Sequence, residues 1–240
     1  MALLEVRGLT RHFGGLRAVA GLDFSVEQGE ILGLIGPNGA GKTTVFNLVT
    51  GFVRPTAGEI RFEGRSMVGL RPHAVTARGV ARTFQVVKPF PGLTVLENAT
   101  LAAFPRHARR RDAEAHAAEA LDRMGLAPKA RILASQLTLM EQKRLEMARA
   151  LATEPRLLLL DEPMGGLNAS EVDVASEIVS RLRATGLTVV LVEHVMKAIM
   201  SISDRVVVIH HGEKIAEGPP AQVVQDSGVI SAYFGRRAGA

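Results

Sequence analysis

Residues 36–44 of the chain read Gly36-Pro37-Asn38-Gly39-Ala40-Gly41-Lys42-Thr43-Thr44. The spacing matches the pattern G-x-x-x-x-G-K-[ST], in which backbone N–H groups surround a phosphate. Glycine permits this close approach because it has no Cβ. The N-terminus of a following helix adds the positive end of its dipole. The segment therefore predicts a phosphate-binding loop between a strand and a helix.

The same loop carries side chains suited to a nucleoside triphosphate and its metal. Lys42 is expected to reach the β- and γ-phosphates, the Thr43 hydroxyl to ligate Mg²⁺, and Thr44 to lie near the α-phosphate. A glycine-rich turn without a ligand is the alternative. The flanking sequence disfavours it, because Glu30–Ile35 is a short apolar run typical of a buried strand, and a helix is expected from Lys42 to about Gly51.

A second polar group follows an apolar run much later in the chain, in Leu157-Leu158-Leu159-Leu160-Asp161-Glu162-Pro163. Four consecutive leucines predict a parallel strand that is buried on both faces. Asp161 is expected to hold Mg²⁺ through water, and Glu162 to polarise the water that attacks the γ-phosphate. Taken alone, these carboxylates are equally consistent with ordinary loop residues. Paired with the phosphate-binding loop, they predict hydrolysis of the triphosphate.

The rest of the chain alternates predicted strands and helices, which is typical of a mostly parallel sheet. Near the N-terminus, half-buried strands are expected over Leu3–Val6, Leu22–Glu27 and Glu59–Phe62. After the leucine strand, which we place at Arg156–Leu160, the expected elements are a helix over Ser170–Ala184, a strand over Thr188–Val192, a helix over Val195–Ser201, a strand over Arg205–His210, and a hairpin at His211–Gly212 that leads to Lys214–Ala216. In such folds the ligand lies at the carboxyl ends of the strands.

The middle of the chain is predicted to be helical, over Thr94–Ala103, Arg111–Met124 and Glu141–Ala152. We expect residues 86–151 to form a helical subdomain inserted into a core made of residues 1–85 and 152–240, within a single domain covering residues 1–240. The expected fold class is therefore α/β. It consists of a core with a mostly parallel sheet, which carries the phosphate-binding loop, and of the inserted helices.

Composition limits the other functions. The chain has no cysteine, which excludes thiol nucleophiles, cysteine-ligated zinc and iron–sulfur clusters. No apolar run approaches the roughly 18 residues of a membrane helix, so we expect a soluble, cytoplasmic protein. Aromatic residues make up only 4%, which argues against stacking on single-stranded nucleic acid. The basic run Arg106–Arg111 is best explained as a solvated helix start or loop, with an anionic lipid surface or the acidic rim of a partner as the alternative.

Through the two motifs above, the chain resembles the ATP-binding cassette family, the ATPase subunits of ABC transporters, over nearly all of its length. The resemblance implies an α/β fold made of a P-loop NTPase core with a mostly parallel sheet, an N-terminal antiparallel β subdomain and an inserted helical subdomain. Gln85, in Arg82-Thr83-Phe84-Gln85, is similar to the Q-loop glutamine that senses Mg²⁺ and water and couples to the membrane domain. His194, after Val192-Glu193, is similar to the switch histidine that contacts the γ-phosphate. Phe13 lies where the family places an aromatic ring on adenine, and an ordinary packing role is its alternative.

Two segments depart from the family pattern. The signature Leu-Ser-Gly-Gly-Gln, which in the family completes the ATP site of the partner subunit, is represented by Leu137-Thr138-Leu139-Met140-Glu141-Gln142. Thr138 keeps a hydroxyl for a phosphate oxygen, whereas Met140 replaces a glycine and Glu141 adds a negative charge. We therefore expect a weakened signature and two unequal sites in the dimer. Asn168, in Gly165-Gly166-Leu167-Asn168, stands where the family usually has Asp.

Further segments resemble the branched-chain amino acid uptake branch of the family. They are residues 13–19, 93–98, 143–146 and 202–205, and the tail from Gly218-Pro219-Pro220 to Ala232-Tyr233-Phe234-Gly235. The resemblance implies ATP and Mg²⁺ as cofactors. It also implies a second ATPase subunit, in a heterodimer or alternatively a homodimer, beneath two membrane permeases at the cytoplasmic face of the bacterial inner membrane. A periplasmic binding protein would deliver the substrate, and no nucleic-acid partner is expected.

Other functions stay open on the sequence alone. Related ATPases serve systems for urea, amides or aromatic acids, or export lipopolysaccharide, because the ATPase does not touch the cargo. A soluble cassette that remodels nucleic acid or ribosomes is expected to show two cassettes or an inserted arm, and this sequence shows one cassette with the ordinary lobe. The non-enzyme alternative is a P-loop protein that binds nucleotide without hydrolysis, which Lys42, Asp161, Glu162 and His194 oppose.

Overall fold

The computed structural model describes residues 2–234, so that Met1 and residues 235–240, with Gly235 of the tail, lie outside the described residues. The elements in chain order are β1 (Ala2–Phe13), β2 (Leu16–Glu27), β3 (Ile31–Ile35), α1 (Lys42–Val49), β4 (Ala57–Phe62), β5 (Arg65–Ser66), α2 (Pro72–Ala77), β6 (Val80–Arg82), α3 (Val95–Ala103), α4 (Arg110–Arg123), α5 (Leu139–Leu151), β7 (Leu157–Asp161), α6 (Ala169–Ala184), β8 (Thr188–Val192), α7 (Met196–Ile202), β9 (Arg205–His210), β10 (Glu213–Gly218), α8 (Pro220–Val223) and α9 (Ser227–Phe234). Single 3₁₀ turns at Ala127–Lys129 and Ala134–Gln136 connect α4 to α5.

The central sheet has its strands in the order β10-β9-β3-β8-β7-β6. All neighbouring strands in it are parallel except β10, which pairs antiparallel with β9 at one edge. The predicted mostly parallel sheet is therefore confirmed. Because β6, β3, β7 and β8 run in the same direction, the loops that follow them leave the sheet at one common edge, where α/β folds bind their ligands.

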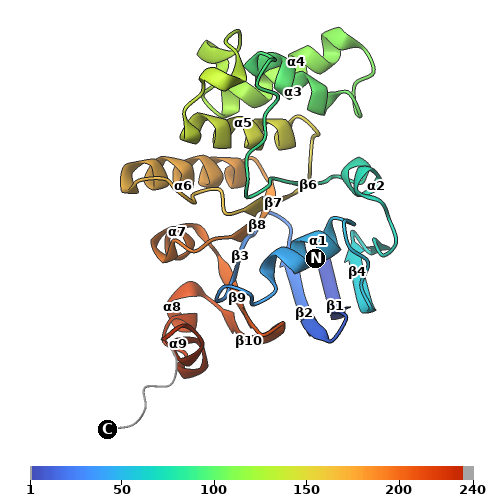
Figure 1. Ribbon diagram of the computed structural model, residues 1–240, viewed down its shortest axis with the longest axis vertical. Helices are drawn as coiled ribbons and strands as arrows, with labels where there is room; N and C mark the ends of the chain where they lie inside the picture. Colours follow the sequence, from blue (N-terminus) through green and yellow to red (C-terminus); the bar gives the residue numbers. More distant parts are fainter. Residues whose placement is uncertain (1, 235–240) are drawn as a thin grey trace.

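The leucine strand β7 shows why this sheet is buried on both faces. Its side chains alternate between two apolar clusters, as the period of a strand requires. Leu157 and Leu159 pack with α1 and the N-terminal strands, whereas Leu158 and Leu160 pack with α6 and the helices of the middle segment. All four leucines are at most 1% exposed. Figure 1 shows β7 and β8 between these two layers.

A second, antiparallel sheet has the order β2-β1-β4-β5. The sequence predicts only the inner halves of its long strands, over Leu3–Val6 and Leu22–Glu27, whereas β1 and β2 each extend over 12 residues. They meet in a tight hairpin, in which Phe13 lies opposite Leu16. The outer halves bury only Leu9, Val19 and Ala20, without a regular alternation. Their sequence therefore gives no clear strand pattern, and backbone pairing extends both strands to the hairpin.

The helices α3, α4 and α5 form a lobe at one end of the molecule, shown in green and yellow in Figure 1. The predicted apolar face of the second helix is confirmed, because Ala113, Ala117, Leu121 and Met124 are at most 1% exposed. At the entry to the lobe the buried Asn98 donates from Nδ2 to the carbonyl oxygens of Phe90 (3.1 Å) and Thr94 (2.9 Å). These bonds hold the segment that leads from the central sheet into α3.

Several short elements carry no clear signal in the sequence, namely α2, β5, β6, α8 and α9. β6 is only three residues long, which is too short for a period, and it forms because it pairs in parallel with β7. None of the helices in the described part of the chain combines the length and the apolar character that a bilayer-spanning segment needs.

Candidate active site

The glycine-rich loop joins β3 to α1, as its sequence predicts. Its conformation requires glycine at two positions with positive φ, Gly36 (155°) and Gly41 (106°). A Cβ at Gly36 would lie 2.0 Å from the carbonyl oxygen of Ile209, and one at Gly41 would lie 2.4 Å from that of Ala18. Because neighbouring backbone packs this closely, the loop keeps its curved shape. The helix α1 begins directly after Gly41, so its first N–H groups face the loop.

Lys42 lies inside this loop and is only 6% exposed. Its Nζ donates hydrogen bonds to the carbonyl oxygens of Gly36 (2.6 Å) and Pro37 (3.0 Å). Burial lowers the pKa of the Lys42 ammonium below its ordinary value, while the carboxylates of Glu162 and Asp161 oppose that shift. The loop carbonyls and the carboxylates at the end of β7 thus both lie close enough to the Lys42 ammonium to interact with its charge. The adjoining Thr43 side chain is exposed at the surface of the loop.

Asp161 ends β7 in a buried ion pair with Arg82, at 2.8 Å between Oδ2 and Nη2. Burial raises the pKa of the Asp161 carboxyl, and the Arg82 guanidinium opposes that shift. The other carboxylate oxygen, Oδ1, is buried and has no hydrogen-bond partner among the described residues. A hard cation that prefers oxygen ligands, such as Mg²⁺, or a water bound to it would satisfy that atom. The donor set therefore fits the expected metal.

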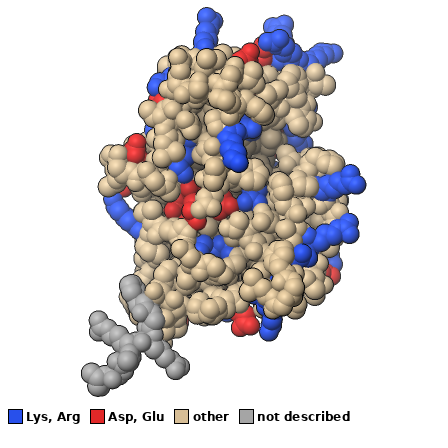
Figure 2. Space-filling model, viewed as in Figure 1, with Lys and Arg blue, Asp and Glu red and all other residues tan. Residues whose placement is uncertain are grey.

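Glu162 lies at the centre of a group drawn from three strand ends. Its Oε2 accepts a hydrogen bond from Gln85 Nε2 at 2.7 Å, and its Oε1 lies 2.7 Å from His194 Nε2. Gln85, Glu162 and His194 follow β6, β7 and β8 respectively. The structure thus brings together three residues that are far apart in the sequence. Figure 2 shows acidic side chains gathered near the middle of the face in view, with basic side chains around them.

Three charged residues around this group are given no role by the sequence motifs. Glu193 is 2% exposed and accepts from the backbone N–H groups of Met164 (2.6 Å) and His194 (3.0 Å), which ties the end of β8 to the loop after Glu162. Burial raises the pKa of its carboxyl. Lys143 of α5 donates from Nζ to the carbonyl oxygen of Glu162 at 3.0 Å. The third residue is Arg82. A charge directly after the predicted strand Thr188–Val192 is the signal that marks Glu193, whereas Arg82 ends β6, which the sequence does not predict.

Phe13, the expected adenine-stacking residue, lies at the end of β1 with its side chain 43% exposed. The guanidinium of Arg11 lies over the ring, 4.5 Å from its centre. Within the part of the chain that the structure describes, neither apolar cluster includes this ring. Burial in the core therefore does not explain its position, and the contact with adenine stays a prediction.

The segment that replaces the family signature begins α5. The Thr138 hydroxyl accepts from the Glu141 N–H at 3.4 Å, and the Glu141 carboxylate accepts from the Thr138 N–H at 3.1 Å, so the pair caps the helix. Lys129 pairs with Glu141 at 2.5 Å and is the main cause of the lowered pKa of that carboxyl. The Met140 side chain is 6% exposed and packs into the lobe. Only the backbone at this position is therefore available to a neighbouring molecule.

Asn168 also serves its own helix, because its Oδ1 accepts from the Glu171 N–H at 3.0 Å at the start of α6. The residue that departs from the family pattern is thus a favourable cap.

Two family models match the sequence. The model described as ABC transporter matches residues 19–165, which include the glycine-rich loop, Gln85 and the carboxylates that end β7. The model described as branched-chain amino acid ATP-binding cassette transporter matches residues 213–239 near the C-terminus.

Curated relatives match along nearly the whole chain. The sequence is 45% identical over 250 aligned residues to the high-affinity branched-chain amino acid transport ATP-binding protein BraF of Pseudomonas aeruginosa, covering 97% of this chain and 98% of that protein. It is 42% identical over 249 residues to the protein LivG of the same description from Escherichia coli, again covering 97% and 98%.

Solved structures show the same architecture. The ADP conformation of MJ1267, an ATP-binding cassette of an ABC transporter, matches with a TM-score of 0.90 at 28% identity, covering 98% of this chain and 100% of that one. A dimeric, post-hydrolysis structure of the ATP-binding cassette MJ0796, bound to ADP and Pi, matches with a TM-score of 0.80 at 25% identity, covering 90% and 98%.

Proposed function

Because this chain belongs to the ABC transporter family of ATP-binding cassettes, we propose that it is the ATPase subunit of an importer for branched-chain amino acids. The observation that carries this proposal is the convergence of Gln85, Glu162 and His194 at the sheet edge that also holds the glycine-rich loop. The similarity to BraF and LivG and the match of the C-terminal segment support the class of cargo.

The chemistry follows from the positions of the side chains. The triphosphate would lie between the Lys42 ammonium and the carboxylates of Asp161 and Glu162, where the positive charge of Lys42 stabilises the phosphate oxygens. Glu162 would polarise the attacking water, and His194 holds the Glu162 carboxylate at 2.7 Å on the side opposite Gln85. We propose Thr43, Asp161 and Gln85 as the groups that hold Mg²⁺, which would neutralise charge on the transferred phosphate.

We propose that the chain acts as one cassette, with residues 1–85 and 152–240 as the core and 86–151 as the helical subdomain. Two cassettes would close head to tail on two ATP molecules, with Phe13 on adenine and Thr138, Met140 and Glu141 facing the partner's nucleotide. The dimeric MJ0796 structure, bound to ADP and Pi, supports the pairing of two cassettes. A partner of different sequence, a peripheral position at the cytoplasmic face of the bacterial inner membrane, and a periplasmic binding protein belong to the same proposal.

A groove beside Gln85 is the place where we propose that a permease docks. It has a volume of about 240 Å³ and lies between the core and the lobe, with Phe52, Phe84 and Ala102 among its lining residues. Phe52 and Phe84 are 53% and 44% exposed, and their rings meet edge to face at 5.8 Å between centres. Exposed aromatic rings in a groove suit an apolar protein segment. Because Phe84 precedes Gln85 in the chain, movement in this groove reaches the catalytic group directly.

The cargo is tested with the assembled transporter in vesicles. We expect ATP turnover to rise when a binding protein loaded with leucine, isoleucine or valine is added, because closure of the cassettes is coupled to the permeases. Stimulation by urea, a short amide or an aromatic acid instead would assign the chain to one of the related systems. Turnover that no cargo changes would contradict the importer assignment, and lipopolysaccharide export would then be examined.

The weakened signature gives a separate prediction for the assembled complex. Glu141→Gln is expected to raise ATP turnover about fivefold, because it removes a negative charge worth about 1 kcal/mol beside the partner's γ-phosphate. Steady-state phosphate release measures the effect. The result that contradicts unequal sites is turnover that neither Glu141→Gln nor Met140→Gly changes. Met140→Gly is the less informative variant, since the buried Met140 side chain also stabilises the lobe.

A further inference from the structure

Two histidines and a glutamate meet far from the candidate active site. His107 Nε2 lies 2.9 Å from Glu154 Oε1, and His116 Nδ1 lies 3.0 Å from the same oxygen. The two imidazole rings are stacked, with 3.8 Å between their centres and 12° between their planes. Each ring therefore places one nitrogen within 3.0 Å of the same oxygen, Glu154 Oε1. Among the described residues this is the one group of three such side chains whose ligand atoms all lie within 4.8 Å of one another.

The spacing of the three atoms suits a small cation. With metal–ligand bonds of about 2.0–2.1 Å in a tetrahedron, neighbouring ligand atoms are about 3.3 Å apart. The two measured nitrogen–oxygen distances of 2.9 and 3.0 Å are slightly shorter than this edge. Each imidazole nitrogen binds a metal through a lone pair in its own ring plane, so the two stacked rings must rotate apart to receive one cation. The side chains are partly exposed, at 19% for His107, 39% for His116 and 46% for Glu154, which leaves room for that movement.

The charges around the group favour a cation. Within the described part of the chain, the ion-pair partners of Glu154 are the two imidazoles. Two nearby guanidinium groups are neutralised by other carboxylates, Arg123 by Glu119 and Arg156 by Glu63. The carboxylate of Glu154 is therefore not already balanced by a permanent positive charge. Arg106 lies nearby, and its positive charge opposes the binding of a cation. Its Nε donates to the carbonyl oxygen of Thr153 at 3.2 Å.

The group joins the lobe to the core. His107 lies between α3 and α4, His116 lies on α4, and Glu154 lies in the connection between α5 and β7. Glu154 has a left-handed backbone, with φ of 52°, which glutamate adopts at a cost. Glu154 precedes β7 in the chain, whereas Asp161 is the last residue of β7. The five residues of β7 span about 13 Å, so the group lies at the edge of the sheet opposite the nucleotide site.

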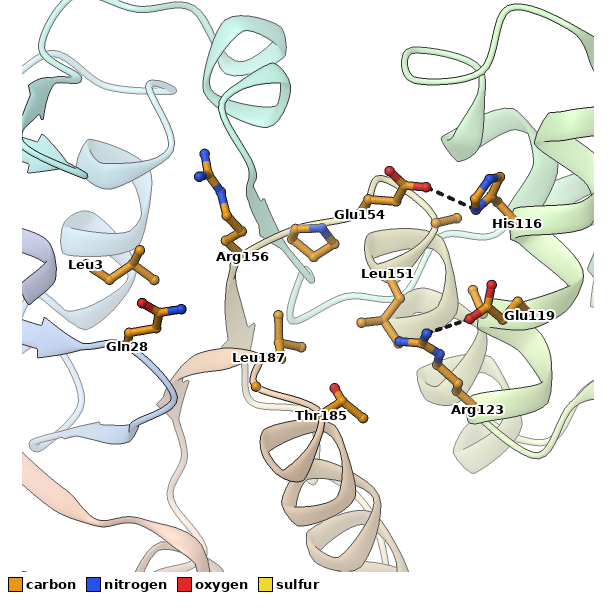
Figure 3. A pocket seen from close by; sticks show the side chains of 14 residues that line it. Leu3, Gln28, His116, Glu119, Arg123, Leu151, Glu154, Arg156, Thr185 and Leu187 are labelled. Carbon is orange, nitrogen blue, oxygen red and sulfur yellow. Dashed lines mark hydrogen bonds and ion pairs between the residues drawn. The ribbon is translucent and has the colours of Figure 1, made fainter.

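A pocket of about 470 Å³ opens beside the group. Its lining includes His116, Glu119, Glu154 and Arg156. Figure 3 shows the His116 ring and the Glu154 carboxylate turned toward each other, and the Arg123–Glu119 pair one turn farther along α4. The pocket gives water access to a cation held by the three side chains. A fourth, solvent-supplied ligand can therefore complete a tetrahedron.

We propose that His107, His116 and Glu154 bind one Zn²⁺ ion that links the helical lobe to the core. Two imidazole nitrogens and one carboxylate oxygen are a ligand set that Zn²⁺ accepts. Mg²⁺ and Ca²⁺ prefer oxygen ligands alone, which sets this site apart from the candidate Mg²⁺ site at Asp161. The bound ion fixes the α3–α4 connection and α4 to the segment that enters β7. It thereby restrains rotation of the lobe against the central sheet.

The test is a zinc titration of the metal-free purified chain, followed by calorimetry, with no nucleotide added. We expect one ion per chain and a Kd at least tenfold weaker in His116→Ala and in Glu154→Gln, because each removes one of three protein ligands. His107→Ala is a third variant, placed outside a helix, in case a change within α4 affects folding. X-ray absorption of the zinc complex is expected to show imidazole scattering, which a surface carboxylate site would not give.

Two control variants make the outcome decisive. His73→Ala removes an exposed histidine of α2 that lies outside the group, and His194→Ala removes the histidine beside Glu162. Neither is expected to change the zinc Kd. Zinc binding that is absent from the unchanged chain, or that His116→Ala and Glu154→Gln leave unaltered, overturns the proposal. Loss of binding in His194→Ala also overturns it, because the ion would then lie in the nucleotide site.

Discussion

Glu162→Gln is expected to lower ATP turnover of the assembled complex by at least about 100-fold, the lower range of the effect of a general base. Glutamine has the size of glutamate and can still contact Gln85 and His194, which lie at 2.7 Å from the two carboxylate oxygens. It cannot accept a proton from water. ATP binding is therefore retained while hydrolysis stops, and we expect a closed, ATP-bound dimer to accumulate. Phosphate release measures the first effect, and size-exclusion chromatography with Mg²⁺ and ATP measures the second.

The matched control for this variant is Glu177→Gln, which removes the same charge from an exposed position on α6. It is expected to hydrolyse ATP at the rate of the unchanged chain. Unaltered turnover in Glu162→Gln would refute the assignment of Glu162 as the group that polarises water.

Lys42→Ala is expected to weaken ATP binding by at least about 100-fold. The Lys42 Nζ makes two hydrogen bonds to loop carbonyls and is 6% exposed, so it is placed to donate to phosphate oxygens from inside the loop. Hydrogen bonds to charged groups contribute about 1.5–3 kcal/mol each, so the loss of two amounts to about 3 kcal/mol or more. Equilibrium binding of a fluorescent ATP analogue to the purified chain measures the change.

Lys197→Ala is the control for the lysine variant, because Lys197 forms an exposed ion pair with Asp173 on the surface. Such pairs contribute little to stability, and we expect ATP binding to be unchanged. The phosphate-binding role of the loop would be contradicted if Lys42→Ala, shown to be folded by circular dichroism, bound ATP as tightly as the unchanged chain.

The fold was predictable where side-chain burial follows a regular period. The four leucines of β7 are buried on alternating faces, and the alanine-rich face of α4 packs inside the lobe, as the sequence indicates. The outer halves of β1 and β2 and the three residues of β6 were not predictable. They are held by backbone pairing with neighbouring strands, and such pairing leaves no periodic pattern in the side chains.

The candidate site was predictable from motifs whose spacing is local, such as the loop that ends in Lys42 and the carboxylates after β7. The contacts between motifs were not. Arg82 and Asp161 are 79 positions apart in the sequence, and their buried ion pair depends on the parallel pairing of β6 with β7. The same holds for Glu193, whose carboxylate links two strand ends. For Met140, helix periodicity rather than the signature pattern determines where the side chain points.

The central claim is that Lys42, Asp161 and Glu162 surround one triphosphate. A crystal structure of the Glu162→Gln chain with Mg²⁺ and ATP tests it most directly. We expect the β- and γ-phosphates in the glycine-rich loop, with Lys42 Nζ donating to their oxygens, Asp161 beside the metal and the side chain at position 162 facing the γ-phosphate. A triphosphate bound elsewhere, or a γ-phosphate turned away from position 162, would contradict the account.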